Sequence, residues 1–263
     1  MSHRPLAVVT GASSGIGREL CKVLSDEGFD LVVAAEDDEL AGAADELRRH
    51  GAEVEAVRVD LATADGVEEL ARRVRAQERP VDALALNAGR SIGGAFVGGT
   101  PLDQDLLVID LDVRSVVHLA KLLLPAMVER GEGRVLITSS VAATTPGPYQ
   151  ATYNASKSFI QSFSLAIREE LKDTGVTVTA LMPGPTETEV FERAEMMDTK
   201  IGTDDSKDSP ALVARQAFEG MMAGDERVRG GGLSSKLQGI AGRLGPDSLK
   251  AKVFTRMARP GTD

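Results

Sequence analysis

The sequence is poor in cysteine, in basic charge and in aromatic residues. Cys21 is the only cysteine among 263 residues, so no disulfide can form within the chain, and a reducing compartment is favoured. The formal net charge is −10. Proteins that bind nucleic-acid backbones usually present a basic face, so this acidic balance argues against a nucleic-acid partner.

Long apolar runs and metal-binding patterns are also missing. The longest apolar run, VVHLAKLLLPAMV, is interrupted by His118, Lys121 and Pro125, and it is too short to span a bilayer. The first residues, MSHRPLAVVTG, lack the apolar core of a signal peptide, so we expect a cytoplasmic protein. His3, His50 and His118 are scattered with no second ligand at metal spacing, so we expect no metal site.

Short runs of β-branched residues alternate with longer amphipathic stretches. Most of the runs are almost continuously apolar, which is typical of a parallel sheet buried on both faces. The alternation predicts an α/β fold, a doubly wound parallel sheet flanked by helices. The expected strands are residues 6–10, 30–35, 53–59, 81–86, 133–138 and 176–182. The expected helices are about residues 15–27, 38–50, 63–78, 103–130 and 151–173.

The pattern changes after residue 185. A short amphipathic piece (188–197) and a polar run lead to an expected helix at about residues 209–223. A glycine-rich break near residue 229 opens a helical C-terminal extension, about residues 229–263. Apolar residues recur there at roughly helical spacing: Leu237, Ile240, Leu244, Leu249, Val253 and Met257. This stripe either packs on the domain or binds a membrane surface or a partner.

A glycine-rich turn, TGASSGIG (10–17), follows the first expected strand and precedes a helix. Glycines let backbone N–H groups approach a phosphate, and a helix N-terminus adds partial positive charge. The spacing is neither that of the G-x-G-x-x-G fingerprint nor that of a P-loop. Tight packing alone would also explain such a turn.

Two further strand ends favour a ligand over packing. Asp60-Leu61 ends the third expected strand, and Asn87-Ala88-Gly89 ends the fourth. Ligands of open α/β sheets bind at the carboxyl ends of the strands. A dinucleotide laid across that edge explains the glycine turn and both clusters together.

The stretch YNASK (153–157) contains one of the two tyrosines in the chain. In a helix, Tyr153 and Lys157 would lie on one face, one turn apart. A free tyrosine with a pKa of about 10 is a poor base at neutral pH. A nearby ammonium stabilises phenolate and lowers that pKa, so the spacing suits a tyrosine that exchanges protons with a substrate.

Together, these motifs resemble those of the short-chain dehydrogenase/reductase family. The matching pieces are TGASSGIG (10–17), Asp60, NAG (87–89), Ser140, YNASK (153–157) and PGPTET (183–188), in the family's order and at its spacings. The resemblance covers residues 6 to about 190. It implies one Rossmann-like domain over residues 1–263, with a substrate lid at about 185–207. It also implies an NAD(P)-dependent oxidoreductase that transfers hydride between a nicotinamide cofactor and a carbonyl or alcohol substrate.

The resemblance also assigns roles to residues. The pyrophosphate side would be held by Gly11, Ser13, Ser14, Gly15, Ile16 and Gly17. Asp60 and Leu61 would flank adenine, while the adenosine ribose and backbone would lie along Asn87, Ala88 and Gly89. The nicotinamide half would contact Pro183, Gly184, Thr186 and Thr188. Tyr153 would be the general acid/base, Lys157 its tuner and a ribose ligand, and Ser140 the residue that holds the substrate oxygen.

One position departs from the family pattern. Many relatives have an asparagine in the helix after the fourth strand, where it helps to hold a water in a proton relay from the lysine. Here that position is Asp112. An ionised aspartate accepts hydrogen bonds but does not donate them, so we expect a relay through acceptance only, with altered pH dependence. A merely structural replacement is the alternative.

The second strand indicates which nicotinamide cofactor is preferred. It ends in Ala34-Ala35-Glu36, and Glu36 could accept from ribose hydroxyls and would repel a 2′-phosphate. Ser14 is not basic, and Arg18 is expected to point to solvent. The prediction is therefore NAD(H) in preference to NADP(H).

The substrate side and the assembly are less specified. Residues 90–96, with Val190, Phe191 and Met196-Met197, would border a pocket for a small or medium apolar carbonyl or alcohol. The extension replaces the final strand that builds a tetramer in many relatives. We therefore expect a homo-oligomer, a dimer through helices 103–130 and 151–173 rather than a tetramer. The alternative function is a non-catalytic dinucleotide-binding sensor or interaction protein on the same fold.

Overall fold

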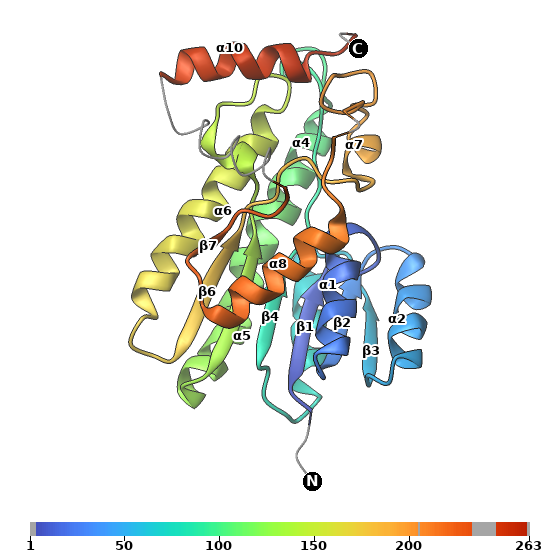
Figure 1. Ribbon diagram of the computed structural model, residues 1–263, viewed down its shortest axis with the longest axis vertical. Coiled ribbons are helices and arrows are strands. Elements are labelled where there is room, and N and C mark those ends of the chain that lie inside the picture. The colour runs from blue at the N-terminus through green and yellow to red at the C-terminus, as the bar shows by residue number, and fades with distance from the viewer. Residues whose placement is uncertain (1–3, 205, 233–245, 262–263) are drawn as a thin grey trace.

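The computed structural model describes residues 4–204, 206–232 and 246–261, and within these ranges the chain forms one seven-stranded parallel sheet (Figure 1). The strand order is β3-β2-β1-β4-β5-β6-β7. The strands are β1 (Leu6–Thr10), β2 (Asp30–Ala35), β3 (Val54–Arg58), β4 (Ala83–Leu86), β5 (Gly133–Thr138), β6 (Val176–Leu181) and β7 (Arg227–Val228). The expected α/β class is therefore confirmed. Only β7 was missed, because its two residues are too few to make a pattern.

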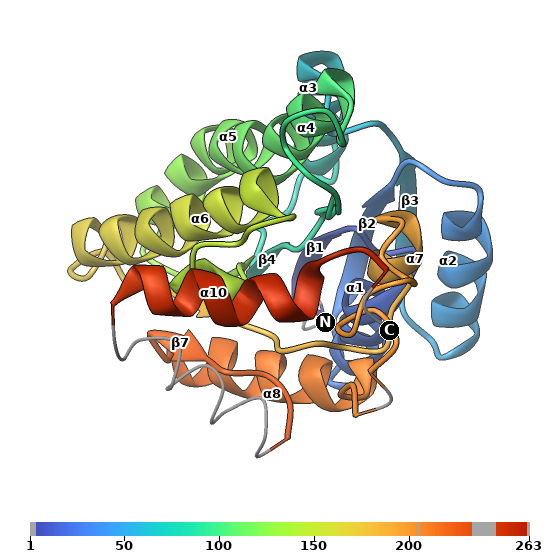
Figure 2. The same cartoon turned by 90° about the horizontal axis from the view of Figure 1, so that it is seen from above.

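Helices cover both faces of the sheet. One face carries α1 (Gly15–Asp26), α2 (Glu39–Arg49) and α8 (Pro210–Ala223), and the other carries α3 (Ala64–Arg75), α4 (Leu102–Ile109), α5 (Ser115–Arg130) and α6 (Ala151–Glu170), as Figure 2 shows. Because side chains alternate along each strand, β1 sends Ala7 and Val9 to the first face and Leu6 and Val8 to the second. The strands are buried on both sides, as their apolar sequences predict.

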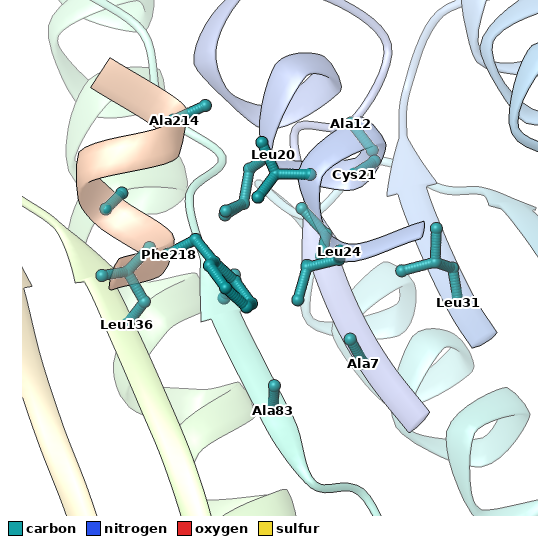
Figure 3. Packing of buried hydrophobic residues seen from close by; sticks show 14 of the residues in the cluster. Ala7, Ala12, Leu20, Cys21, Leu24, Leu31, Ala83, Leu136, Ala214 and Phe218 are labelled. Atoms are coloured by element: carbon teal, nitrogen blue, oxygen red, sulfur yellow. The ribbon is translucent and has the colours of Figure 1, made fainter. Parts of the chain in front are cut away.

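The core between α1, α8 and the sheet is closely packed. Leu20 and Leu24 of α1 are fully buried and lie near Phe218 of α8 (Figure 3). Cys21 is also fully buried there, where it packs as a small core residue. This packing fixes the start of α1, and hence the glycine-rich turn before it.

The long helix expected over residues 103–130 is interrupted. Between α4 and α5 the chain makes a π-helical turn, Asp110–Arg114, and Asp112 in its middle is only 1% exposed. Single π-helical turns inside helices are frequent at functional sites. The π-helical turn therefore contains Asp112, the residue that departs from the family pattern.

The carboxyl ends of the strands meet beneath two late elements. The short helix α7 (Val190–Arg193) and the C-terminal helix α10 (Asp247–Ala258) lie over that edge (Figures 1 and 2). Of the expected apolar stripe, Leu249, Val253 and Met257 belong to α10 and face the cavity described below. Leu237, Ile240 and Leu244 lie outside the described residues. None of the described helices is long and apolar enough to cross a membrane.

Candidate active site

A cavity of about 930 Å³ runs along the carboxyl ends of the strands. Nearly all of the site residues expected from the sequence line this cavity, from the glycine turn after β1 to residues 183–188. Those lining it are Gly11, Ser13, Ser14, Gly15, Ile16, Glu36, Asp60, Leu61, Asn87, Ala88, Gly89, Ser140, Tyr153, Lys157, Pro183, Gly184, Thr186 and Thr188. Two expected residues, Gly17 and Asp112, do not line it.

The glycine turn has the shape of a phosphate cradle. Gly11 and Gly15 have φ angles of +67° and +54°, which side chains disfavour. A Cβ on Gly11 would lie 2.9 Å from the Cα of Ala88, so β4 approaches the turn closely. Gly17 has a different role from the one expected. A Cβ there would lie 2.0 Å from the Gly11 carbonyl oxygen, so Gly17 lets α1 pack against the turn.

Asn87 joins three strands at the floor of the cavity. Its side-chain amide donates to the carbonyls of Thr10 (3.2 Å) and Gly11 (3.4 Å). Its side-chain oxygen accepts from the hydroxyl of Thr138 at 3.1 Å. These bonds connect the ends of β1, β4 and β5, so Asn87 fixes the edge of the sheet on which a dinucleotide would lie.

Helix α6 brings Tyr153 and Lys157 together as the spacing predicts. The Lys157 Nζ lies 5.6 Å from the centre of the Tyr153 ring. The Ser139 hydroxyl donates to the Lys157 backbone carbonyl at 2.8 Å, which anchors α6 to the end of β5. Ser140, the next residue, shares a hydrogen bond with the Tyr153 side chain. A substrate oxygen can therefore meet both hydroxyls at one end of the cavity.

Asp112 lies behind this group and forms an ion pair with Lys157. The distance between Asp112 Oδ2 and Lys157 Nζ is 3.0 Å, and both residues are buried. The carboxylate also accepts from the Arg90 N–H at 2.8 Å and from the Ser156 hydroxyl at 3.3 Å. Lys157 Nζ further donates to the Thr138 carbonyl at 3.4 Å. From the sequence, Asp112 could accept from a water or from Lys157, and the structure shows the direct contact with Lys157.

The ion pair decides the charge state of Lys157. Burial opposes the ammonium, but the charge of Asp112, the neighbouring Tyr153 and the hydrogen bond that Lys157 donates to Asp112 outweigh it, so the pKa of Lys157 is raised above its ordinary value. A raised pKa keeps Lys157 charged across the neutral range.

The pKa of Tyr153 differs from the expectation. Burial raises it, the Lys157 ammonium lowers it, Asp112 raises it and the hydrogen bond with Ser140 lowers it, with a net rise. The field of Lys157, expected to lower the pKa of the phenol, is outweighed in the cofactor-free protein. The physical reason is that burial disfavours phenolate and Asp112 offsets much of the field of Lys157.

The adenosine end of the cavity is acidic. Glu36 and Asp37 follow β2 and line the cavity. One oxygen of Asp37 accepts from the Ser13 hydroxyl at 2.9 Å, and the other is buried with no hydrogen-bond partner among the described residues. This buried carboxylate oxygen of Asp37 can still accept a hydrogen bond, and it lies beside the glycine turn. Such an acceptor fits the hydroxyl groups of a nucleotide ribose. The geometry of this end therefore suits a dinucleotide.

The basic residues near that end are already engaged. Arg18, which was expected to point to solvent, has a side chain that is 42% exposed, and its guanidinium pairs with Glu46 of α2 at 2.6 Å. Arg193 of α7 pairs with Glu189 at 2.5 Å and lies 3.8 Å from Asp37. The contact with Asp37 links the lid to the nucleotide end of the cavity.

The other end of the cavity combines expected border residues with residues that the sequence did not assign to the site. Gln150 and Ser91 are buried and joined by a hydrogen bond of 2.8 Å, and Gln150 also donates to the sulfur of Met196 at 3.0 Å. Five residues of α10 complete this end: Leu249, Lys250, Val253, Phe254 and Met257. Of the expected border, Arg90, Ser91, Val190 and Phe191 line the cavity, whereas Phe96 and Met197 do not and are more than half exposed. The apolar stripe predicted the helix, but not its place over the cavity, because that place depends on tertiary packing.

Known proteins share both the sequence and the fold. A family model described as short chain dehydrogenase matches residues 5–198. A short chain dehydrogenase from Pseudocercospora fijiensis is 37% identical over 196 residues, which cover 73% of this chain and 63% of that protein. The chain thus spans somewhat less than two thirds of that relative.

Two solved structures show the same architecture with different cofactors. A short-chain dehydrogenase from Sphingobium yanoikuyae, in complex with NADPH, aligns with a TM-score of 0.79 and 29% identity, covering 86% of this chain and 87% of that one. A short-chain dehydrogenase/reductase from Burkholderia phymatum, in complex with NAD, aligns with a TM-score of 0.79 and 26% identity, covering 87% and 90%.

The ion pair leads to a prediction about the phenol of Tyr153. Because Tyr149 is the only other tyrosine, the variant Tyr149→Phe contains a single phenol. Its tyrosinate absorbance should titrate with a pKa above the ordinary value of about 10 in the cofactor-free protein. Adding Asp112→Asn should lower that pKa, because the substitution removes the negative charge that opposes phenolate.

The measurement is an ultraviolet pH titration of the two variants, with circular dichroism on the same samples to confirm that they stay folded. Equal titration curves for the two proteins would show that Asp112 does not influence Tyr153. A pKa below the ordinary value in Tyr149→Phe would contradict the dominance of burial.

Proposed function

The chain belongs to the short-chain dehydrogenase family, a family of NAD(P)-dependent oxidoreductases, and we propose that its cavity transfers hydride between the cofactor and a carbonyl or alcohol carbon with Tyr153 as the general acid/base. One observation carries this proposal. The hydroxyls of Ser140 and Tyr153 and the ammonium of Lys157 converge on the same cavity as the glycine turn. A protein that only binds a nucleotide has no need of this group.

The side chains divide the proton chemistry among them. When bound, the nicotinamide supplies the hydride for reduction or takes it up in oxidation. In reduction, Tyr153 donates its proton to the carbonyl oxygen while the Ser140 hydroxyl holds that oxygen in place. In oxidation, the phenolate of Tyr153 takes the alcohol proton. The Lys157 ammonium stabilises the phenolate formed during reduction and would bind the nicotinamide ribose hydroxyls. With its raised pKa, Tyr153 is protonated at neutral pH, so the proton needed for reduction is present.

The nicotinamide and adenine contacts follow from the lining of the cavity. Pro183, Gly184, Thr186 and Thr188 lie on the lid side and would meet the nicotinamide half. Asp60 would hold the adenine end through its place at the carboxyl end of β3, where its own carboxylate already accepts from the Ala62 N–H at 2.8 Å. Leu61 is buried beside it.

Asp112 acts in this proposal as a positioning residue with a proton-accepting role. Its carboxylate holds Lys157 at 3.0 Å and accepts from Arg90 and Ser156, so it can accept from Lys157 or from a water but cannot donate. This is the relay through acceptance expected from the sequence. Indistinguishable pH–rate profiles for the native enzyme and Asp112→Asn would contradict a relay role.

The acids after β2 support NAD(H) as the preferred cofactor. Glu36 and Asp37 line the adenosine end, where a 2′-phosphate would meet their negative charge. Arg18 is paired with Glu46, which draws it away from such a phosphate. The solved relatives bind either NADPH or NAD, so the family alone does not decide the preference.

A dimer is supported by exposed apolar side chains on the helices expected to form it. Leu102, Leu106 and Ile109 of α4 are exposed at helical spacing, and Phe159 of α6 is exposed while stacked on Phe163. Helices α4 and α6 pack against each other, so these side chains belong to one region of the surface. A monomeric mass in sedimentation equilibrium would contradict the dimer.

The cytoplasmic location stays a prediction from the sequence.

The runner-up function is a dinucleotide sensor without catalysis. Asp112 and the C-terminal extension are the features that depart from the family pattern and keep this alternative open. The two functions differ in one observable. A sensor binds the cofactor but does not oxidise or reduce any member of a broad panel of alcohols and carbonyls.

The central prediction concerns Tyr153→Phe. Removing only the hydroxyl should lower kcat by about 10²–10⁴-fold, the range that positioned proton transfer contributes. Cofactor binding should be retained, because the ring and Lys157 remain. The measurement is nicotinamide absorbance with a panel of alcohols and carbonyls, together with cofactor titration by fluorescence. Tyr149→Phe is the matched control, since it removes the other phenol hydroxyl of the chain.

A second prediction concerns the cofactor. Steady-state kinetics should give a higher kcat/KM with NADH than with NADPH, because Glu36 and Asp37 repel the added phosphate. The double variant Glu36→Gln/Asp37→Asn should narrow the difference by removing that repulsion. A strong preference of the native enzyme for NADPH would overturn the assignment.

A further inference from the structure

The C-terminal helix α10 forms the roof of the cavity at its substrate end. Leu249, Val253, Phe254 and Met257 of this helix line the same cavity as Ser140 and Tyr153. They occupy positions i, i+4, i+5 and i+8, which is one face of a helix. The apolar face of α10 is therefore turned toward the reacting end of the site.

The roof is fixed to the lid by backbone hydrogen bonds. The Ile201 N–H donates to the Met257 carbonyl, and the Gly261 N–H donates to the Asp198 carbonyl, both at 3.1 Å. Ala258 packs in a small buried cluster with Phe191, Ala194 and Met196 of the lid. These contacts hold α10 and residues 190–201 together as one wall.

Two side chains of the roof are apolar and more than half exposed. Leu249 is 57% exposed and Val253 is 52% exposed, although both line the cavity. Apolar surface left in water is unfavourable by about 25 cal/mol per Å², and the surface is removed from water when an apolar group packs against it. Phe191 and Val190 of the lid also line the cavity, so a group in this space meets apolar side chains from two elements.

The charge of the roof is already balanced. Lys250 also lines the cavity, and its Nζ lies 3.0 Å from the carboxylate of Asp247. The stem of the lysine can still cover an apolar surface while its ammonium stays with Asp247. This end of the cavity therefore suits an uncharged body better than an anionic one.

We propose that the substrate carries an extended, uncharged hydrocarbon body next to its reacting carbonyl or alcohol carbon, and that this body packs beneath α10 with Leu249 and Val253 as specificity-determining residues. The inference rests on the proposed function for the position of the reacting carbon. The proposed substrate is larger than the small or medium one expected from the sequence. The reason is that α10 extends the apolar lining of the cavity beyond the residues that the motifs identify. A chain and a ring system both meet this requirement, since both bury the same kind of surface.

The test uses unbranched methyl ketones from butanone to dodecanone. The first readout is binding, measured by calorimetry with Tyr153→Phe in the presence of the nicotinamide cofactor. Affinity should rise about two- to fourfold for each added methylene until the chain fills the space beneath the roof. The second readout is kcat/KM of the native enzyme for the same series, and a keto acid of the length of octanone should be a poorer substrate than octanone itself.

The roof is tested with Leu249→Ala/Val253→Ala. The ratio of kcat/KM for dodecanone to kcat/KM for butanone should fall about tenfold, because the apolar surface that meets the long chain is removed. Leu212→Ala is the matched control, since Leu212 is 43% exposed on α8 and does not line the cavity, and it should leave the ratio unchanged. Circular dichroism melting verifies that the variants fold.

The outcomes separate the two proposals. Binding that strengthens with chain length and depends on Leu249 and Val253 supports the inference, whether or not the ketones are turned over. Turnover of butanone with no gain from longer chains, or equal ratios in the roof variant and the control, overturns the inference and leaves the oxidoreductase standing. Absence of turnover for every ketone and alcohol tested counts against the oxidoreductase, while the binding series still decides the role of α10.

Discussion

The buried ion pair between Asp112 and Lys157 is the contact on which the rest of the site depends. Two charges withdrawn from water are tolerated only when they meet each other and further hydrogen bonds, and removing one partner of such a pair costs about 3–5 kcal/mol. Here the π-helical turn supplies Asp112, α6 supplies Lys157 and the loop after β4 supplies the Arg90 N–H. The pair therefore connects three separate elements behind the reacting group.

Gly89 lies next to this ion pair, and the pair leaves no room for a side chain there. A Cβ on Gly89 would lie 2.9 Å from Lys157 Nζ and 3.1 Å from the Asp112 carboxylate, so a side chain there would press on the pair. Gly89 was assigned to the cofactor on the family resemblance, and the structure adds this second constraint. The same backbone can thus border a dinucleotide on one side and leave room for an ion pair on the other.

Much of the fold and of the site could be predicted because local patterns determine them. The buried strands are almost continuously apolar, and parallel strands bring their carboxyl ends to one edge, so Gly11, Asp60 and Asn87 had to meet once the strand order was formed. The spacing of Tyr153 and Lys157 is likewise a local property of a helix. The direct contact between Asp112 and Lys157, the engagement of Arg18 by Glu46 and the place of α10 depend on how distant helices pack. No short pattern in the sequence encodes those contacts.

The same distinction explains the acidity of Tyr153. The sequence offers two positive charges near the phenol, Lys157 and an oxidised nicotinamide, and both lower its pKa. The fold adds two opposing effects, burial of the phenol and the negative charge of Asp112. A bound oxidised nicotinamide would bring a positive charge into the same enclosure, where low polarity strengthens its field, and this would favour phenolate again. The ionisation of Tyr153 would then depend on the bound cofactor. The phenol would stay protonated until the positive charge of the oxidised nicotinamide is present to stabilise phenolate.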